Sequence, residues 1–256
     1  SDPQRIMAKL SLAHGYYLAG ELTKADRTYA EVMADLERTG RNETIVAVNA
    51  LSNWGDVLFE SDIARAEPLY RRAVELRRTI EGPDIAPRNL FSLAEVLSEL
   101  ARYEEARPLF EETIRNARTV SDRRIERAAR LSLADLCSAT GDLERAAAEI
   151  TEAEAVLVHN PQIVIPPSAG HLSYSRGLLA LSRGNVIAAR EFFTDSLKRY
   201  GNRRDSNRVL AELGLSRAEL TLGQPREAEA AARRALEIAA SLVMKGAPSY
   251  LEGQAQ

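Results

Sequence analysis

The sequence AEVLSELARYEEARPLF at residues 94–110 contains the pattern that decides the fold. A small residue, Ala94, is followed two helical turns later by a short break, then by Ala106 and by an apolar residue four positions on, Phe110. Apolar residues recur every three or four positions on both sides of the break, as they do on one face of an α-helix. The stretch therefore predicts two amphipathic helices joined by a tight turn.

The same pattern occurs six times along the chain. It recurs at 13–29, 54–70, 134–150, 177–193 and, more loosely, 216–232. The alanines that anchor the second helix of each pair are Ala25, Ala66, Ala106, Ala146, Ala189 and Ala228, at separations of 41, 40, 40, 43 and 39 residues. Alanine allows two helices to cross closely without breaking either. Because the turn and the apolar residue accompany each alanine, we expect a repeated helix-turn-helix unit rather than chance alanines.

Residues that start and stop helices lie at the expected places. Gly20, Gly141, Gly184 and Gly223 stand where a helix end needs a left-handed residue, and the second unit has Ser61 instead. Asp142 and Asn185 are expected N-caps, and Pro225 suits a first helical turn. Between units we expect breaks at Gly40, Gly82-Pro83, Ser121-Asp122, Pro161–Gly170 and Gly201-Asn202.

The repeated unit resembles the tetratricopeptide repeat (TPR) across essentially the whole chain. The family's pairing of a small residue with an alanine occurs as Ala13/Ala25, Gly55/Ala66, Ala94/Ala106, Ala134/Ala146, Gly177/Ala189 and Ser216/Ala228. Its aromatic residue occurs as Tyr29, Tyr70, Phe110 and Phe193, but as Ile150 and Ala232 in the fourth and sixth units. The period exceeds the usual length of about 34 residues. It is similar to the long-helix repeats of kinesin light chains and of the sensor regions of large bacterial transcription activators.

The resemblance implies an all-α, right-handed α-solenoid superhelix of about six repeats. We expect one domain over 1–256, with repeats at 4–40, 42–81, 84–120, 121–160, 168–201 and 203–245, and 246–256 as a tail or cap. Leu242, Val243 and Met244 could pack under Tyr250 and Leu251 as that cap, or mark where the solenoid was cut. The alternative repeat class, HEAT, has a similar period but lacks the Gly-turn-Ala signature.

In such a superhelix the first helix of each pair lines a concave groove. The residues expected to face inward are Asn49, Asn53, Asp56, Arg88, Phe91, Glu95, Leu131, Asp135, His171, Tyr174, Leu178, Leu213 and Arg217. Asn49 and Asn53 are four residues apart and so share a face, where they could hold a peptide backbone or simply be solvated. The carboxylates of Glu95 and Asp135 do not match the basic clamp of chaperone-binding repeats. They would repel an acidic tail, so a neutral or basic partner is favoured.

Composition excludes several kinds of site. Cys137 is the one cysteine, which excludes an intramolecular disulfide, and we expect it to be buried. His14, His159 and His171 are not at metal-ligand spacing, and no phosphate loop, nucleophile elbow or kinase signature occurs. We therefore expect no metal, no cofactor and no catalytic residue, so the protein is not expected to be an enzyme.

Charge and hydropathy limit the classes of partner that we expect. The net charge is −3, which gives no reason to expect a nucleic acid, and no apolar run is long enough to span a membrane. Residues Lys198–Arg208 carry a local charge of +4, which could contact an acidic group but is more typical of a solvated turn between repeats. No signal peptide is visible, so a cytoplasmic location is expected.

These observations predict a scaffold that binds a protein or peptide in its groove. We expect it to be a regulatory or interaction segment of a larger bacterial signalling or transcription-control protein, since the chain begins at Ser1 rather than Met. The alternative is a sensor domain that binds a small-molecule effector in the same groove. The sequence leaves open the identity of the partner, the adjoining domains and the oligomeric state.

Overall fold

The computed structural model describes residues 2–59, 61–82, 86–160, 166–203 and 205–242. The secondary structure of these residues is helical throughout, with turns between the helices. The described helices are α1 (Asp2–Leu18), α2 (Leu22–Arg38), α3 (Ile45–Phe59), α4 (Ile63–Glu81), α5 (Pro87–Glu99), α6 (Tyr103–Thr119), α7 (Arg123–Thr140), α8 (Leu143–His159), α9 (Pro166–Ser182), α10 (Val186–Tyr200), α11 (Ser206–Thr221) and α12 (Pro225–Leu242). None of them is long and apolar enough to cross a membrane.

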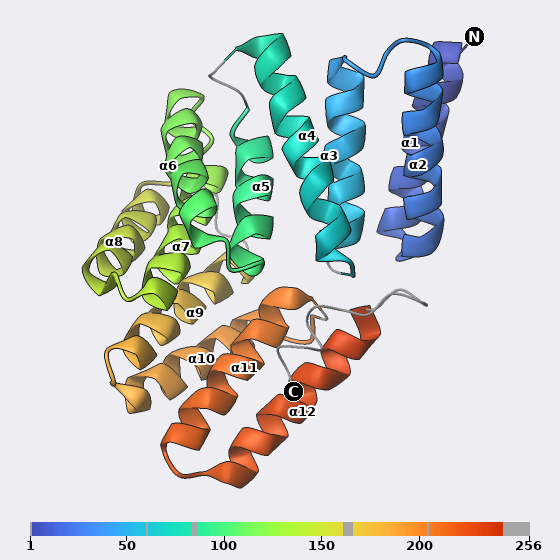
Figure 1. The fold of residues 1–256 in the computed structure, drawn as a ribbon. Helices are drawn as coiled ribbons and strands as arrows, with labels where there is room; N and C mark the ends of the chain where they lie inside the picture. The colour runs from blue at the N-terminus through green and yellow to red at the C-terminus, as the bar shows by residue number, and fades with distance from the viewer. Residues whose placement is uncertain (1, 60, 83–85, 161–165, 204, 243–256) are drawn as a thin grey trace.

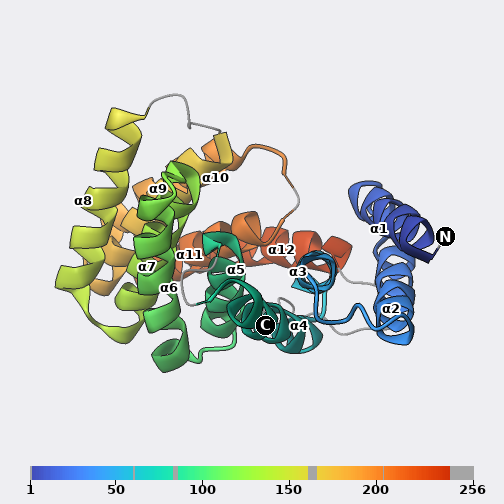
Figure 2. The same cartoon turned by 90° about the horizontal axis from the view of Figure 1, so that it is seen from above.

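The helices pack in pairs, and the pairs stack in chain order. Each odd-numbered helix packs against the even-numbered helix that follows it, and each pair also contacts the next pair. Figure 1 and Figure 2 show the row curving, so that α11 and α12 come round to face α3 and α5 across the inside of the curve. The predicted all-α architecture of TPR-like helix-turn-helix units is therefore confirmed.

Close contacts between a glycine and an aromatic ring join α3 to α4 and α9 to α10. Tyr70 on α4 is buried, and a methyl group added at Gly55 on α3 would lie 2.6 Å from its ring. Phe193 on α10 is fully buried, and a methyl group at Gly177 on α9 would lie 2.7 Å from its ring. The interior is packed at close to crystal density, so these rings fit only because the facing residue has no side chain. This is the physical reason for the small residue in the repeated pattern.

The helix ends follow the predicted signals. Gly20, Gly141, Gly184 and Gly223 all adopt positive φ, in the region where only glycine is unstrained. Asp142 caps α8 by accepting a hydrogen bond from the Arg145 amide, Asn185 caps α10 in the same way, and Pro225 begins α12. Ala101 and Ser121 also adopt positive φ, at +57° and +58°. A left-handed turn therefore forms at Ala101 without glycine, which the sequence pattern does not reveal.

One predicted break is shorter than expected. Helix α9 begins at Pro166, so residues 166–170 of the predicted Pro161–Gly170 break are helical. The prediction was wrong there because proline is compatible with the first turn of a helix, where its missing N–H has no intrahelical partner. Residues 161–165, Pro83 and the segment that contains Val243, Met244, Tyr250 and Leu251 lie outside the described residues, and so does the predicted cap.

Buried ion pairs connect successive repeats. The Glu126 side chain on α7 is 2% exposed and accepts hydrogen bonds of 2.7 Å from both Arg118 and Arg123. Burial raises the pKa of Glu126, but these two hydrogen bonds outweigh it and hold the pKa below its usual value. Arg130, 5% exposed, lies 2.5 Å from Glu149 on α8. Because each charge has a partner, α6, α7 and α8 can bury them together.

Candidate functional site

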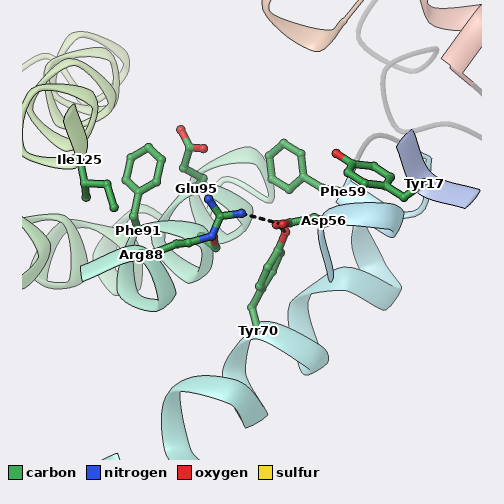
Figure 3. A pocket seen from close by; sticks show the side chains of 9 residues that line it. Tyr17, Asp56, Phe59, Tyr70, Arg88, Phe91, Glu95 and Ile125 are labelled. Carbon is green, nitrogen blue, oxygen red and sulfur yellow. Dashed lines mark hydrogen bonds and ion pairs between the residues drawn. The ribbon is translucent and has the colours of Figure 1, made fainter. Parts of the chain in front are cut away.

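The concave side contains a first cavity between α3 and α5, here called the aromatic cavity. Its volume is about 310 Å³. It is lined by Tyr17, Asp56, Phe59, Tyr70, Arg88, Phe91, Ser92, Glu95 and Ile125. Figure 3 shows Phe59 and Tyr17 on one side, Phe91 and Ile125 on the other, and the Arg88–Asp56 pair between them. The cavity is open to solvent and combines apolar walls with a charged pair.

The polar groups of the aromatic cavity are fixed by each other. Asp56 accepts a hydrogen bond of 2.8 Å from the Tyr70 hydroxyl and pairs with Arg88 at 2.8 Å. Burial, together with the Asp56 carboxylate, raises the pKa of Tyr70 well above its usual value, so the hydroxyl stays protonated and donates to Asp56. The Arg88 side chain is 63% exposed, so its guanidinium can still reach a ligand carbonyl.

A second, larger cavity lies further along the curve and is called the Tyr174 cavity. Its volume is about 610 Å³. It is lined by Ser98, Glu99, Tyr103, Asp135, Leu136, Ala139, Tyr174, Leu178, Leu210, Leu213, Gly214, Ser216, Arg217 and Ala232. Most of these residues come from α5, α7, α9 and α11. The curvature of the row is what brings α5 and α11 to the same cavity.

A small recess joins the two cavities into one groove. This acidic recess has a volume of about 70 Å³ and shares Glu95 with the aromatic cavity. It shares Glu99, Asp135 and Tyr174 with the Tyr174 cavity. Within it, Ser132 donates a hydrogen bond of 3.0 Å to Glu95, and His171 Nε2 lies 2.8 Å from an Asp135 carboxylate oxygen. The three adjacent cavities therefore form a row that extends from α3 to α11, called the groove below.

The groove carries an excess of negative charge. Its described lining includes four carboxylates (Asp56, Glu95, Glu99 and Asp135) and two arginines (Arg88 and Arg217). Burial and the nearby Asp135 and Glu99 carboxylates raise the pKa of the Tyr174 hydroxyl well above its usual value, and Arg217 only partly offsets them. The arrangement favours a ligand that brings positive charge to the recess.

Of the thirteen residues expected from the sequence to face inward, eight charged or aromatic ones line this groove. They are Asp56, Arg88, Phe91, Glu95, Asp135, His171, Tyr174 and Arg217. The further inward positions Leu178 and Leu213 also line it. Their role in binding stays a prediction.

Three expected positions do not line the groove. Asn49 on α3 is exposed and Asn53 is half-buried beside Tyr29, and neither contributes to the described walls of the cavities. Leu131 is fully buried, so its expected inward exposure was wrong. Helix α7 is surrounded by α5, α6, α8 and α9, which leaves only a narrow stripe facing the groove.

Several lining residues were not expected from the sequence. Tyr17, Phe59, Glu99 and Leu210 all belong to odd-numbered helices. Phe59 follows Asp56 by three residues and Glu99 follows Glu95 by four, so each shares a helix face with a residue that was expected. Extending the inward stripe by one helical turn would have found both.

Two other predictions concern groups outside the groove. Cys137 is fully buried, as predicted, and burial raises the pKa of its thiol. In the basic segment, Arg199 pairs with Asp195 and Arg203 pairs with Asp205, each at 2.6 Å, while Arg208 donates to the Gly201 carbonyl. These arginines stabilise the turn, which favours a structural role. Among the described residues, no group of His, Cys, Asp and Glu is placed to hold a metal ion.

Comparison with known proteins gives a family match over almost the whole chain. Residues 1–247 match the model of the MalT-like TPR region. No curated protein matches.

Solved structures share the fold at low sequence identity. NprR in complex with its cognate peptide NprX has a TM-score of 0.75 at 11% identity, over 93% of this chain and 70% of that one. Aspartyl phosphate phosphatase F from Bacillus subtilis has a TM-score of 0.70 at 13% identity, over 93% of this chain and 60% of that one. A Rap protein complexed with Competence and Sporulation Factor has a TM-score of 0.66 at 16% identity, over 93% of this chain and 77% of that one.

Proposed function

The chain belongs to the MalT-like TPR family, and on this basis we propose that it is a scaffold that binds a peptide or protein segment in its concave groove. It acts in the cytoplasm as a regulatory or interaction segment of a larger bacterial signalling or transcription-control protein. The observation that carries the proposal is the length of the groove, a row of three adjacent cavities from α3 to α11 in which the acidic recess shares lining residues with each of the other two. An extended peptide matches such a surface better than a compact ligand does.

The chemistry of the groove supports a neutral or basic peptide. Aromatic walls at Phe59 and Phe91 offer contact area to an apolar side chain, and the Arg88 guanidinium can donate to a backbone carbonyl. The carboxylates of Glu95 and Asp135 favour positive charge further along. Two of the structural relatives, NprR and the Rap protein, were solved with bound peptide or signalling factor, which adds support at the level of the fold.

A small-molecule effector is the second candidate, and the size of the Tyr174 cavity favours it. Its volume of about 610 Å³ falls in the range of ligand pockets. The cavity is open and adjoins the acidic recess, however, whereas effector pockets are usually more enclosed. We propose no catalytic role, although aspartyl phosphate phosphatase F has a similar fold.

Selection from a displayed library tests the proposal. Random linear nonapeptides would be selected on the immobilised chain, and each enriched peptide would then be tested on two variants. Glu95→Lys lies inside the groove, and Glu229→Lys lies on the exposed surface of α12. The proposal expects enriched peptides that carry Lys or Arg beside apolar residues and that lose affinity for Glu95→Lys alone. No enrichment, or equal binding to both variants, would contradict it.

A further inference from the structure

The acidic recess is rich in carboxylates. Among the described residues it is lined by three carboxylates, those of Glu95, Glu99 and Asp135, and by no lysine or arginine. Its volume of about 70 Å³ is far below that of the Tyr174 cavity, about 610 Å³. It can therefore hold the charged head of a ligand side chain but not a whole ligand.

Asp135 carries a charge that its neighbours compensate incompletely. One carboxylate oxygen lies 2.8 Å from His171 Nε2, while the other is buried and has no hydrogen-bond partner among the described residues. A buried acceptor without a partner is unfavourable, and a nearby positive charge would relieve part of that penalty. The carboxylates are not placed to hold a metal ion, so a metal is not the expected occupant.

The adjoining Tyr174 cavity has the walls that a long apolar stem needs. Leu178, Leu213 and the Tyr174 ring line it, each of them half-buried. The face of a tyrosine ring attracts a cation. Arg217 lines this cavity together with Glu99 and Asp135, but it does not line the recess itself.

We propose that the acidic recess binds the ammonium or guanidinium group of a lysine or arginine side chain of the ligand, while the apolar stem of that side chain lies along Tyr174, Leu178 and Leu213 in the Tyr174 cavity. This subsite rests on the proposed function, since it names the residue that anchors the peptide. Lysine and arginine commonly bury their methylene stems on apolar surface and keep the charged head in a polar environment. The same chemistry is offered by a free amine, so the test separates the two sources.

The three histidines provide the readout. His171 lines the recess, whereas His14 on α1 and His159 at the end of α8 line none of the described cavities of the groove. The ring resonances of protein labelled at histidine would be followed while Nα-acetyl-arginine amide is added at millimolar concentration. The proposal expects a saturable shift of His171 alone, and His14 and His159 report any drift of pH. The citrulline analogue has the same shape without the charge and should leave His171 unshifted.

Two variants locate the binding. Asp135→Asn keeps the size of the side chain and should weaken binding of the arginine amide by about tenfold or more, the effect of losing one partner of a close charge pair. Glu229→Gln, on the exposed surface of α12, should leave the affinity unchanged.

Agmatine, which has no peptide backbone, is the second ligand. Weaker binding of agmatine than of the arginine amide supports a peptide residue as the source. Equal or tighter binding of agmatine would overturn a peptide source.

The outcome separates this subsite from the proposed function. If selected peptides bind the groove but His171 does not respond to the arginine amide, or responds equally to the citrulline analogue, the subsite is wrong while peptide binding stands. If no peptide is selected and His171 does not respond, both fail.

Discussion

Phe193 is enclosed by two glycines, and filling either position tests the packing that joins the last repeats. Its ring on α10 faces Gly177 on α9 and Gly214 on α11. A methyl group at Gly214 would lie 2.5 Å from the ring, and real contacts of this kind are never so short. Gly214→Ala therefore forces either the ring or α11 to move.

The expected loss follows from two opposing effects. In an open helix, alanine in place of glycine stabilises by about 1 kcal/mol. Overpacking a filled interior costs up to about 3 kcal/mol. The net expectation for Gly214→Ala is a loss of about 2 kcal/mol, or a decrease in Tm of roughly 4–8 °C for a chain of this size. Gly15 on α1 has nothing within 4 Å of the added methyl group, so Gly15→Ala should raise the stability by about 1 kcal/mol.

Thermal and urea unfolding followed by circular dichroism measures both changes. The double variant Gly214→Ala/Phe193→Leu should be more stable than the sum of its single changes predicts, because the smaller side chain removes the overlap. The packing argument would be refuted if Gly214→Ala were as stable as the parent chain, or if it raised the Tm as Gly15→Ala is expected to do.

Three further predictions concern single groups. Asp142→Ala should lower the free energy of unfolding by about 1 kcal/mol, because the Arg145 amide loses its cap, and a urea titration checks this. The pKa of Glu126 is lower in the folded chain than in the unfolded chain, so its stabilising contribution is present above the unfolded value of about 4.3 and is lost as the pH falls through the folded value. Urea midpoints should therefore decrease in acid, and less so in Glu126→Gln. Cys137, buried and with a raised pKa, should react with a thiol reagent at least about a hundredfold more slowly than in the urea-unfolded chain, and a rate equal to the unfolded one would contradict its burial.

The fold could be predicted because the repeated residues have local causes. The pairing of Gly55 with Tyr70, and of Gly177 with Phe193, is visible in the sequence as a small residue followed 15 or 16 positions later by an aromatic one. The caps at Asp142 and Asn185 depend on neighbours three residues away. Such short-range requirements recur in several units, so the copies reinforce one prediction.

The groove was harder to predict because it depends on the curvature of the whole row. Glu99 and Arg217 line one cavity although they are more than a hundred residues apart, and a single repeat does not show how far α5 and α11 approach each other. The prediction that Leu131 faces the groove was wrong for a related reason. It lies on α7, which has neighbours on both sides and behind it, so most of its positions are buried.

The central claim is that the concave groove binds the ligand, and the affinity of one selected, fluorescein-labelled peptide tests it most directly. Fluorescence anisotropy would give its Kd for the parent chain, for Glu95→Lys at the junction of the aromatic cavity and the acidic recess, and for Glu229→Lys on the exposed surface of α12. The groove account predicts a Kd higher by about tenfold or more for Glu95→Lys, since a like charge replaces an opposite one, and an unchanged Kd for Glu229→Lys. An unchanged Kd for Glu95→Lys, with its helical spectrum intact, would contradict it.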